Sequence, residues 1–272
     1  MNGFIPILLY HAIGPVPGTT FEPYTVTRRV FARHLDLLSD HGYTPITIND
    51  LVTRLRNGRP CDGLAGVTFD DGFASFADDA WPELVSRSMA ATLYVATGAI
   101  GGTPRWLDDI GCATMPMLDW DQLRELRAEG CEIGAHTVSH PPLDCLALSA
   151  ADVEIRASRD VLTRELDQPV TTFAYPHGHH DRRTRQLVVD AGFVGACAVK
   201  NALSHSGDDP FALARVTITS DLTDHDVAGV LDGTAVGLAP ARERLRTTVY
   251  RAVRRRRHRG TARRTATDRN EV

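Results

Sequence analysis

The sequence predicts an α/β fold in which a parallel sheet is closed, or nearly closed, into a barrel surrounded by helices. Short apolar runs alternate with longer amphipathic stretches along most of the chain, which is typical of parallel strands joined by crossover helices. Several of these runs end abruptly in Asp or His, as in barrels whose chemistry lies beyond the carboxyl ends of the strands. The length of 272 residues suits one such barrel, which commonly takes about 200–250 residues.

Strands are expected where a short run is continuously apolar or alternates in polarity: 5–10, 43–48, 64–69, 91–96, 131–135, 170–174, 193–198 and 213–218. Helices are expected where apolar residues recur every three or four positions: 28–40 after Thr27 as N-cap, a short helix to residue 56 capped by Asn49 or Asp50, 79–87, 121–129, 149–166 with Ser149 as cap, 182–191 and 224–231. Residues 97–120 form a long loop, which indicates a functional segment or a missed element.

Composition places the chain among ordinary globular proteins, with 43% hydrophobic and 24% charged residues. The longest apolar run, residues 4–10, is far too short for a membrane-spanning helix. No basic residue precedes it and no small-residue cleavage site follows it, so a secretory signal is not expected. The five cysteines lack CxxC spacing, which favours reduced thiols and a cytoplasmic location.

The net charge of −4 combines an acidic body and a basic end. Residues 241–272 carry +9, which leaves about −13 for residues 1–240. We expect a catalytic domain over 1–240 and an Arg-rich, disordered tail over 241–272. The tail favours peripheral contact with an anionic membrane surface, at the inner face, over nonspecific contact with nucleic acid. Nothing in the body resembles a nucleic-acid-binding module.

Two adjacent aspartates, Asp70 and Asp71, end the apolar run 64–69. An Asp-Asp-Gly sequence is usually a solvated turn. This pair terminates a strand that should be buried, so its carboxylates need partners or a cation.

Two histidines four residues apart, His136 and His140, follow another expected strand. On one helical turn this spacing places both rings on the same side. A lone HxxxH is weak evidence of a metal site, but this one shares its position in the barrel with the aspartates. Two imidazoles and one carboxylate leave coordination positions open, which is typical of a catalytic metal.

Three segments in this order resemble the first three motifs of the polysaccharide deacetylase family, the NodB-homology domain of carbohydrate esterase family 4: 68–72 (TFDDG), 136–140 (HTVSH) and 173–178 (FAYPHG). The resemblance covers roughly residues 4–235. It implies a distorted (β/α)-barrel of the NodB-homology type and a metal-dependent hydrolase that removes N-acetyl groups from an N-acetylated carbohydrate.

The resemblance also implies a role for each motif residue. Asp70 would be the general base, and Asp71 would ligate one divalent metal with His136 and His140. Zn²⁺ is favoured, with Co²⁺, Ni²⁺ or Fe²⁺ as alternatives. The division suits the chemistry, because binding one carboxylate to a dication keeps it ionised while the other accepts a proton from water.

An amide also needs its leaving nitrogen protonated. Most family members carry this acid in a late Leu-x-His motif, for which residues after 200 offer no convincing counterpart. His11 follows the first strand, in a Tyr-His pair similar to that of family members with a permuted acid. We therefore predict His11 as the acid. His205, in polar surroundings, is the alternative.

The third motif departs from the family pattern at Ala174, where an arginine commonly pairs with the catalytic aspartate. Arg215, in the last expected strand, is a candidate replacement; a water-facing arginine on an edge strand is equally compatible with the sequence. Tyr175, Pro176 and His177 are expected at the substrate, with the backbone N–H of His177 stabilising the oxyanion.

Other interpretations remain open. They are a noncatalytic metal- or sugar-binding relative, a family amidase acting on a non-sugar C–N bond and, further behind, an iron oxygenase that uses the same two histidines and one carboxylate. The cluster of His177, His179 and His180 is more consistent with a surface loop than with a second metal site. Aromatic residues considered for stacking on a sugar are Trp106, Trp120, Tyr10 and Tyr24.

Overall fold

A parallel sheet in the order β10-β9-β8-β7-β6-β2-β12, with β5 also paired to β6, forms the centre of the protein. The computed structural model describes residues 3–15, 20–112 and 114–234. The strands of this sheet are β2 (Ile7–Tyr10), β5 (Thr44–Ile46), β6 (Leu64–Phe69), β7 (Thr92–Val95), β8 (Glu132–Ala135), β9 (Thr172–Ala174), β10 (Gly195–Cys197) and β12 (Val216–Thr217). Two small pairs join β1 (Phe4–Ile5) to β11 (Ser204–His205) and β3 (Ala12–Ile13) to β4 (Thr25–Val26).

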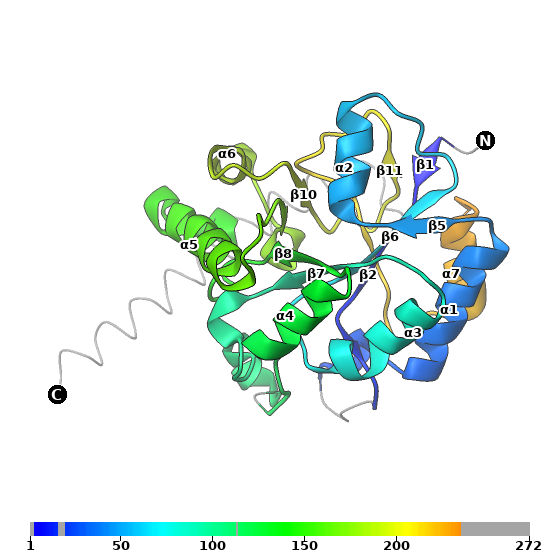
Figure 1. Ribbon diagram of the computed structural model, residues 1–272, viewed down its shortest axis with the longest axis horizontal. Coiled ribbons are helices and arrows are strands. Elements are labelled where there is room, and N and C mark those ends of the chain that lie inside the picture. The colour runs from blue at the N-terminus through cyan, green and yellow to red at the C-terminus, as the bar shows by residue number, and fades with distance from the viewer. Residues whose placement is uncertain (1–2, 16–19, 113, 235–272) are drawn as a thin grey trace.

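Helices surround this sheet in the view of Figure 1. They are α1 (Arg28–Asp40), α2 (Ile48–Arg56), α3 (Trp81–Ser86), α4 (Trp120–Ala128), α5 (Leu148–Leu166), α6 (Arg182–Asp190) and α7 (Asp224–Leu231). An isolated parallel bridge from Cys197 to Leu213 brings the segment before β12 next to β10, the opposite edge of the sheet. The predicted α/β barrel, nearly closed, is therefore confirmed.

In β2, β7, β9 and β10 successive side chains alternate between two apolar clusters, as the period of a strand requires. Leu8 packs into a large cluster with α1 and the other outer helices. Its neighbour Ile7 packs into a smaller cluster inside the barrel, together with Tyr94 and with Leu51 and Val52 of α2. Helix α2 therefore packs against the inner face of the sheet, while the other helices cover its outer face.

Several element boundaries differ from the expectation. Helix α2 begins at Ile48, and its cap is Thr47, whose hydroxyl accepts a hydrogen bond from the backbone of Asp50. Helix α5 begins at Leu148 after Ala147 rather than at a Ser149 cap. The caps were misplaced because several polar residues crowd each helix start. The cap at Thr27 is confirmed.

Two segments carry structure that the sequence pattern did not reveal. A π-helical turn, η2 (Phe76–Ala80), precedes α3 where one continuous helix was expected. The long loop contains the 3₁₀ turns η3 (Thr97–Ala99) and η4 (Arg105–Ile110). The last strand, β12, is shorter than the expected 213–218, and Arg215 immediately before it bonds to Asp70.

None of the five cysteines, all of which lie within the described residues, is in a disulfide. Within the described ranges, no helix has the length and apolar character needed to cross a bilayer. The predicted tail over 241–272 and its membrane contact lie outside the described residues.

Candidate active site

A cavity of about 990 Å³ lies at the carboxyl ends of the strands. Its wall includes His11 after β2, Asp70 and Asp71 after β6, and His136 after β8. The topology explains this grouping, because parallel strands deliver the residues that follow them to the same edge of the sheet. His140 completes the set from the loop that leads to α5.

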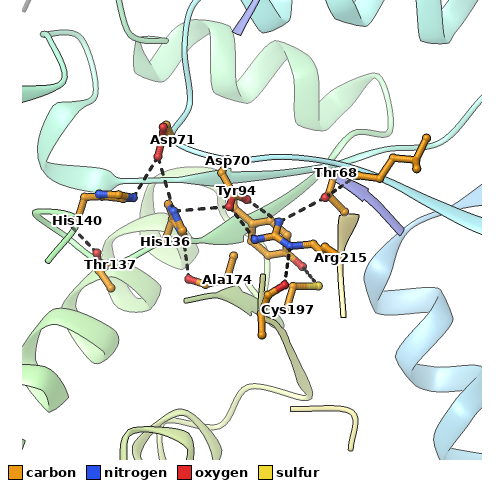
Figure 2. A network of polar contacts seen from close by, with 12 residues as sticks. Thr68, Asp70, Asp71, Tyr94, His136, Thr137, His140, Ala174, Cys197 and Arg215 are labelled. Atoms are coloured by element: carbon orange, nitrogen blue, oxygen red, sulfur yellow. Dashed lines mark hydrogen bonds and ion pairs between the residues drawn. The ribbon is translucent and has the colours of Figure 1, made fainter. Parts of the chain in front are cut away.

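Asp71, His136 and His140 form a buried group whose ligand atoms all lie within 4.8 Å of one another (Figure 2). Oδ1 of Asp71 is 3.6 Å from Nε2 of His136 and 3.3 Å from Nε2 of His140. Two ligands bound at about 2.0–2.1 Å in a tetrahedral site stand about 3.3–3.4 Å apart. The two distances from Asp71 are therefore close to those between ligands of one small divalent cation.

Electrostatics of this group favour a cation. Burial, together with the charge of Asp70, raises the pKa of Asp71 well above its usual value. Oδ1 of Asp71 accepts no hydrogen bond from the described residues, although it is buried. Burial lowers the pKa of both His136 and His140, so their rings are neutral. Neutral imidazoles and an uncompensated carboxylate are the donor set that a dication stabilises.

The backbone of the ligand loops is unusual. Asp71, Thr137 and His140 all have positive φ, at 77°, 68° and 59°. Residues with side chains adopt this region at a cost, and such strain is concentrated at functional sites. In the second loop the amide of His140 donates to the hydroxyl of Thr137, which stabilises this turn.

His136 is oriented by the backbone of β9. Its Nδ1 lies 2.8 Å from the carbonyl oxygen of Ala174. A carbonyl can only accept, so Nδ1 carries the proton and Nε2 presents its lone pair toward Asp71. Ala174 thus contributes through its backbone, although it lacks the arginine side chain common at this position of the motif.

Asp70 is held by a different partner. Arg215 donates from Nη1 to Oδ1 and from Nη2 to Oδ2 of Asp70, each at 2.7 Å. Its remaining bonds go to the hydroxyl of Thr68 (Figure 2) and to the carbonyl of Ala198, and its side chain is 0% exposed. Burial is the largest single influence on the pKa of Asp70 and would raise it. The charge and hydrogen bonds of Arg215, together with nearby His136 and His11, outweigh burial, and the pKa lies below its usual value. Asp70 is therefore ionised at neutral pH.

His11 lines the cavity near Asp70, and its ring packs edge-on against Phe21 and Tyr24. Burial lowers the pKa of His11 to about 4, while the charge of Asp70 acts in the opposite direction. Nδ1 of His11 is buried and has no hydrogen-bond partner among the described residues. The structure does not place His205 in the cavity wall; it is exposed on β11, which pairs with β1 ahead of the first strand of the barrel.

The third motif reaches the cavity through His177. Tyr175 and Pro176 are buried, and the Tyr175 hydroxyl donates to the carbonyl of Phe211, so these two side chains point into the protein. Their expected contact with substrate is not seen in the cavity wall. The ring of His177 lies 4.7 Å, between centroids, from that of His140.

Among the aromatic residues considered for sugar contact, Trp106 and Tyr24 line the cavity. Trp106 stacks on the ring of His140, with 4.7 Å between centroids, and Tyr24 is 42% exposed. Tyr10 and Trp120 pack in the outer apolar cluster instead. The wall formed by α7 and the segment before it could not be predicted from the sequence, because helix periodicity does not tell which helix borders a cavity.

Residues 57–196 match the family model described as Polysaccharide deacetylase. The chain belongs to this family. Among curated relatives of this deacetylase, the YxkH protein of Bacillus subtilis (strain 168) is 24% identical over 220 residues, covering 80% of this chain and 73% of that protein. A poly-beta-1,6-N-acetyl-D-glucosamine N-deacetylase of Staphylococcus aureus (strain MRSA252) is 20% identical over 211 residues, covering 74% and 70%.

Solved structures show that this polysaccharide deacetylase shares its fold with family members. The Streptococcus pyogenes deacetylase PplD, in complex with acetate, aligns with a TM-score of 0.71 at 25% identity, over 87% of this chain and 99% of that chain. IcaB from Ammonifex degensii aligns with a TM-score of 0.73 at 24% identity, with the same coverage. The predicted family and fold are thereby confirmed.

Proposed function

We propose that the protein is a divalent-metal-dependent hydrolase that removes N-acetyl groups from an N-acetylated carbohydrate. The observation that carries this proposal is the placement of an ionised, Arg215-paired Asp70 directly beside the three ligand positions, in one cavity. Relatives named as deacetylases, one of them acting on poly-beta-1,6-N-acetyl-D-glucosamine, support the substrate class.

Asp71, His136 and His140 would hold the metal, for which Zn²⁺ is the first choice because it prefers this mixture of imidazole and carboxylate ligands. Co²⁺, Ni²⁺ and Fe²⁺ accept the same donors. When bound, such an ion polarises the acyl oxygen and acidifies the attacking water.

Asp70 removes a proton from the attacking water as its oxygen bonds to the acyl carbon. Both oxygens of Asp70 accept hydrogen bonds from Arg215, so the carboxylate is fixed in orientation and stays ionised until the proton arrives. His136 Nε2 lies 3.8 Å from Oδ2 of Asp70, so the proposed base is adjacent to a proposed metal ligand, which supports its role toward a water on the ion.

His11 protonates the amine nitrogen as the C–N bond breaks, which releases acetate and a free amino sugar. His11 is neutral in the free protein, because burial depresses its pKa. The proton that His11 delivers to the nitrogen is balanced by the one that Asp70 takes from the attacking water. The backbone N–H of His177 stabilises the negative charge on the acyl oxygen.

Acetate release tests the proposal. Metal-reconstituted protein is incubated with N-acetylated sugars of increasing length and with a simple N-acetylated alkylamine, and acetate and free amine are both measured. We expect equal amounts of the two products from at least one sugar. Equal release from the alkylamine alone would establish the non-sugar amidase instead, and metal binding without release from any substrate would establish the noncatalytic relative.

A further inference from the structure

Of the two histidines in the proposed metal set, only one has a hydrogen bond that fixes its ring. The ring of His136 is fixed by its hydrogen bond to the carbonyl of Ala174. Nδ1 of His140 is buried, and among the described residues it has no hydrogen-bond partner. Metal-ligating histidines usually donate this second nitrogen to an oxygen, which fixes the ring. The position of His140 therefore depends more heavily on its backbone.

That backbone is held from one side by the segment after β7. The amides of Thr97 and Gly98 donate to the carbonyls of Thr137 and Val138, at 3.0 and 2.8 Å. A Cβ atom on Gly98 would lie 2.7 Å from the carbonyl oxygen of Val138, so the contact requires glycine. The two segments thus lie in direct backbone contact.

From the other side the loop is held by one carboxylate, Glu154 on the second turn of α5. Its Oε2 accepts hydrogen bonds from the amides of Val138 and Ser139, at 2.8 and 2.9 Å, and its Oε1 accepts one from the Ser139 hydroxyl at 2.6 Å. These three bonds hold Val138 and Ser139, the two residues between Thr137 and His140. Thr137 and His140 themselves have positive φ.

We infer that Glu154 is a positioning residue for the metal ligand His140, and that it sets the affinity of the site for its cation. The inference rests on the proposed function only in taking Asp71, His136 and His140 as the ligands. Glu154 acts by reach: its carboxylate bridges α5 and the loop, which keeps Nε2 of His140 3.3 Å from Oδ1 of Asp71. Without this bridge the loop relaxes from its positive-φ conformation, and the preformed spacing of the ligands is lost.

Metal affinity, measured without any substrate, tests this. Zn²⁺ dissociation constants are obtained by competition with a chromogenic chelator, and the visible absorption spectrum of the Co²⁺-loaded full chain reports the ligand geometry. We expect Glu154→Ala to weaken Zn²⁺ binding about 10- to 100-fold, the range usual for outer-shell partners of a ligand, and to alter the Co²⁺ spectrum. Glu165→Ala is the matched control, because Glu165 lies on the same helix and pairs with Arg124 away from the cavity.

Two conservative variants separate reach from charge. Glu154→Gln keeps the length and an oxygen that can accept both amides, so it should retain affinity close to wild type. Glu154→Asp keeps the charge but is shorter by one methylene, so it should lose affinity as Glu154→Ala does. If Glu154→Ala does not fold, the Zn²⁺ affinities of Glu154→Gln and Glu154→Asp decide whether Glu154 positions His140.

The outcomes distinguish this inference from the proposed function. If wild-type protein binds Zn²⁺ and folded Glu154→Ala and Glu154→Asp bind it equally well, the inference is overturned and the proposed function stands, even if thermal stability falls. If wild-type protein binds no divalent ion, the proposed metal set is wrong, and the inference fails with it.

Discussion

Arg215 and Asp70 are joined by two parallel 2.7 Å hydrogen bonds in the interior of the barrel, where the arginine side chain is 0% exposed. Asp70 follows β6 and Arg215 precedes β12, and β2 lies between these two strands. The pair therefore ties the last strand of the sheet to the centre of the candidate site. A buried pair of this kind stabilises a fold modestly as a whole, but each partner depends strongly on the other.

Arg215→Met is expected to destabilise the protein by about 3–5 kcal/mol, because it leaves the carboxylate of Asp70 buried without its counter-charge. Arg215→Lys should recover part of this loss, since an ammonium provides the charge but not the planar fork. Urea denaturation of the metal-free proteins measures both. In the double variant Asp70→Asn/Arg215→Met the destabilisation should be smaller than the sum of the single effects; additive losses would show that the two residues are not coupled.

Asp70→Asn should leave the metal content at the wild-type level and lower kcat by about 10²–10⁴-fold, the usual contribution of a general base. An amide cannot accept the proton, but it retains the shape of the carboxylate. Elemental analysis and acetate release on the same preparation measure the two effects. Wild-type kcat in this variant would remove Asp70 from the reaction.

The ligand assignment predicts a different pattern. Asp71→Ala, His136→Ala and His140→Ala should each lose the tight binding of one divalent ion per chain, because three ligands leave no redundancy. Metal content after dialysis against a weak chelator measures this, and His205→Ala, at an exposed position of β11, serves as a control. A variant that keeps one equivalent of metal would show that its residue is not a ligand.

The residues at the carboxyl ends of strands were predictable from the sequence. Asp70, Asp71 and His136 each follow an apolar run directly, and parallel strands deliver such residues to one edge. Arg215 could be identified as a candidate, but its direction could not, because an arginine in a short edge strand faces either side. Whether the side chains of Asp70 and Arg215 meet depends on the twist of the sheet over three strands, and a local sequence pattern does not determine that twist.

The role of Glu154 could not be predicted from the sequence. Nothing about a glutamate in an amphipathic helix distinguishes it from its solvated neighbours, and its role arises from where α5 crosses the loop after β8. The left-handed residues of that loop could not be recognised either, because threonine does not favour positive φ and the enrichment of histidine there is too weak for His140 alone to predict it. Hydrophobic periodicity predicts local structure, so it could not predict which helix packs against which distant loop.

Glu132 provides a prediction at the other end of the barrel. It is the first residue of β8, it is buried, and it accepts hydrogen bonds from Thr92, Thr172 and the amide of Asn49. Burial raises its pKa above the usual value, against the effect of these bonds. In the pH range above the ordinary pKa of a glutamate, the folded state therefore keeps a proton that the unfolded state has released. Its contribution to stability is complete at low pH and declines as the pH rises through the folded pKa.

Glu132→Gln removes this titration. The free energy of unfolding of the variant, relative to wild type, should therefore increase as the pH is raised from about 4, the region of an ordinary carboxyl, to neutrality. Urea denaturation of both metal-free proteins across this range measures the difference, in which the titration of other groups cancels. Glu165→Gln, at a half-buried surface position, is the control. A difference that stays constant with pH would mean that the pKa of Glu132 is not raised.

The identity of the acid is tested by comparing two kinds of substrate. If His11 protonates the leaving nitrogen, His11→Ala should retain metal and fold but lose most activity on an N-acetylated sugar. On an aryl acetate ester it should lose much less, because a phenolate leaves without a proton. His205→Ala should change the activity on either substrate very little, since His205 is exposed and does not line the cavity. An amide-selective loss in His205→Ala, with His11→Ala unaffected, would place the acid late in the chain and contradict the assignment made from the first strand.

Equal losses on amide and ester in His11→Ala would instead assign His11 to substrate binding, because only proton donation to the leaving group depends on how basic that group is.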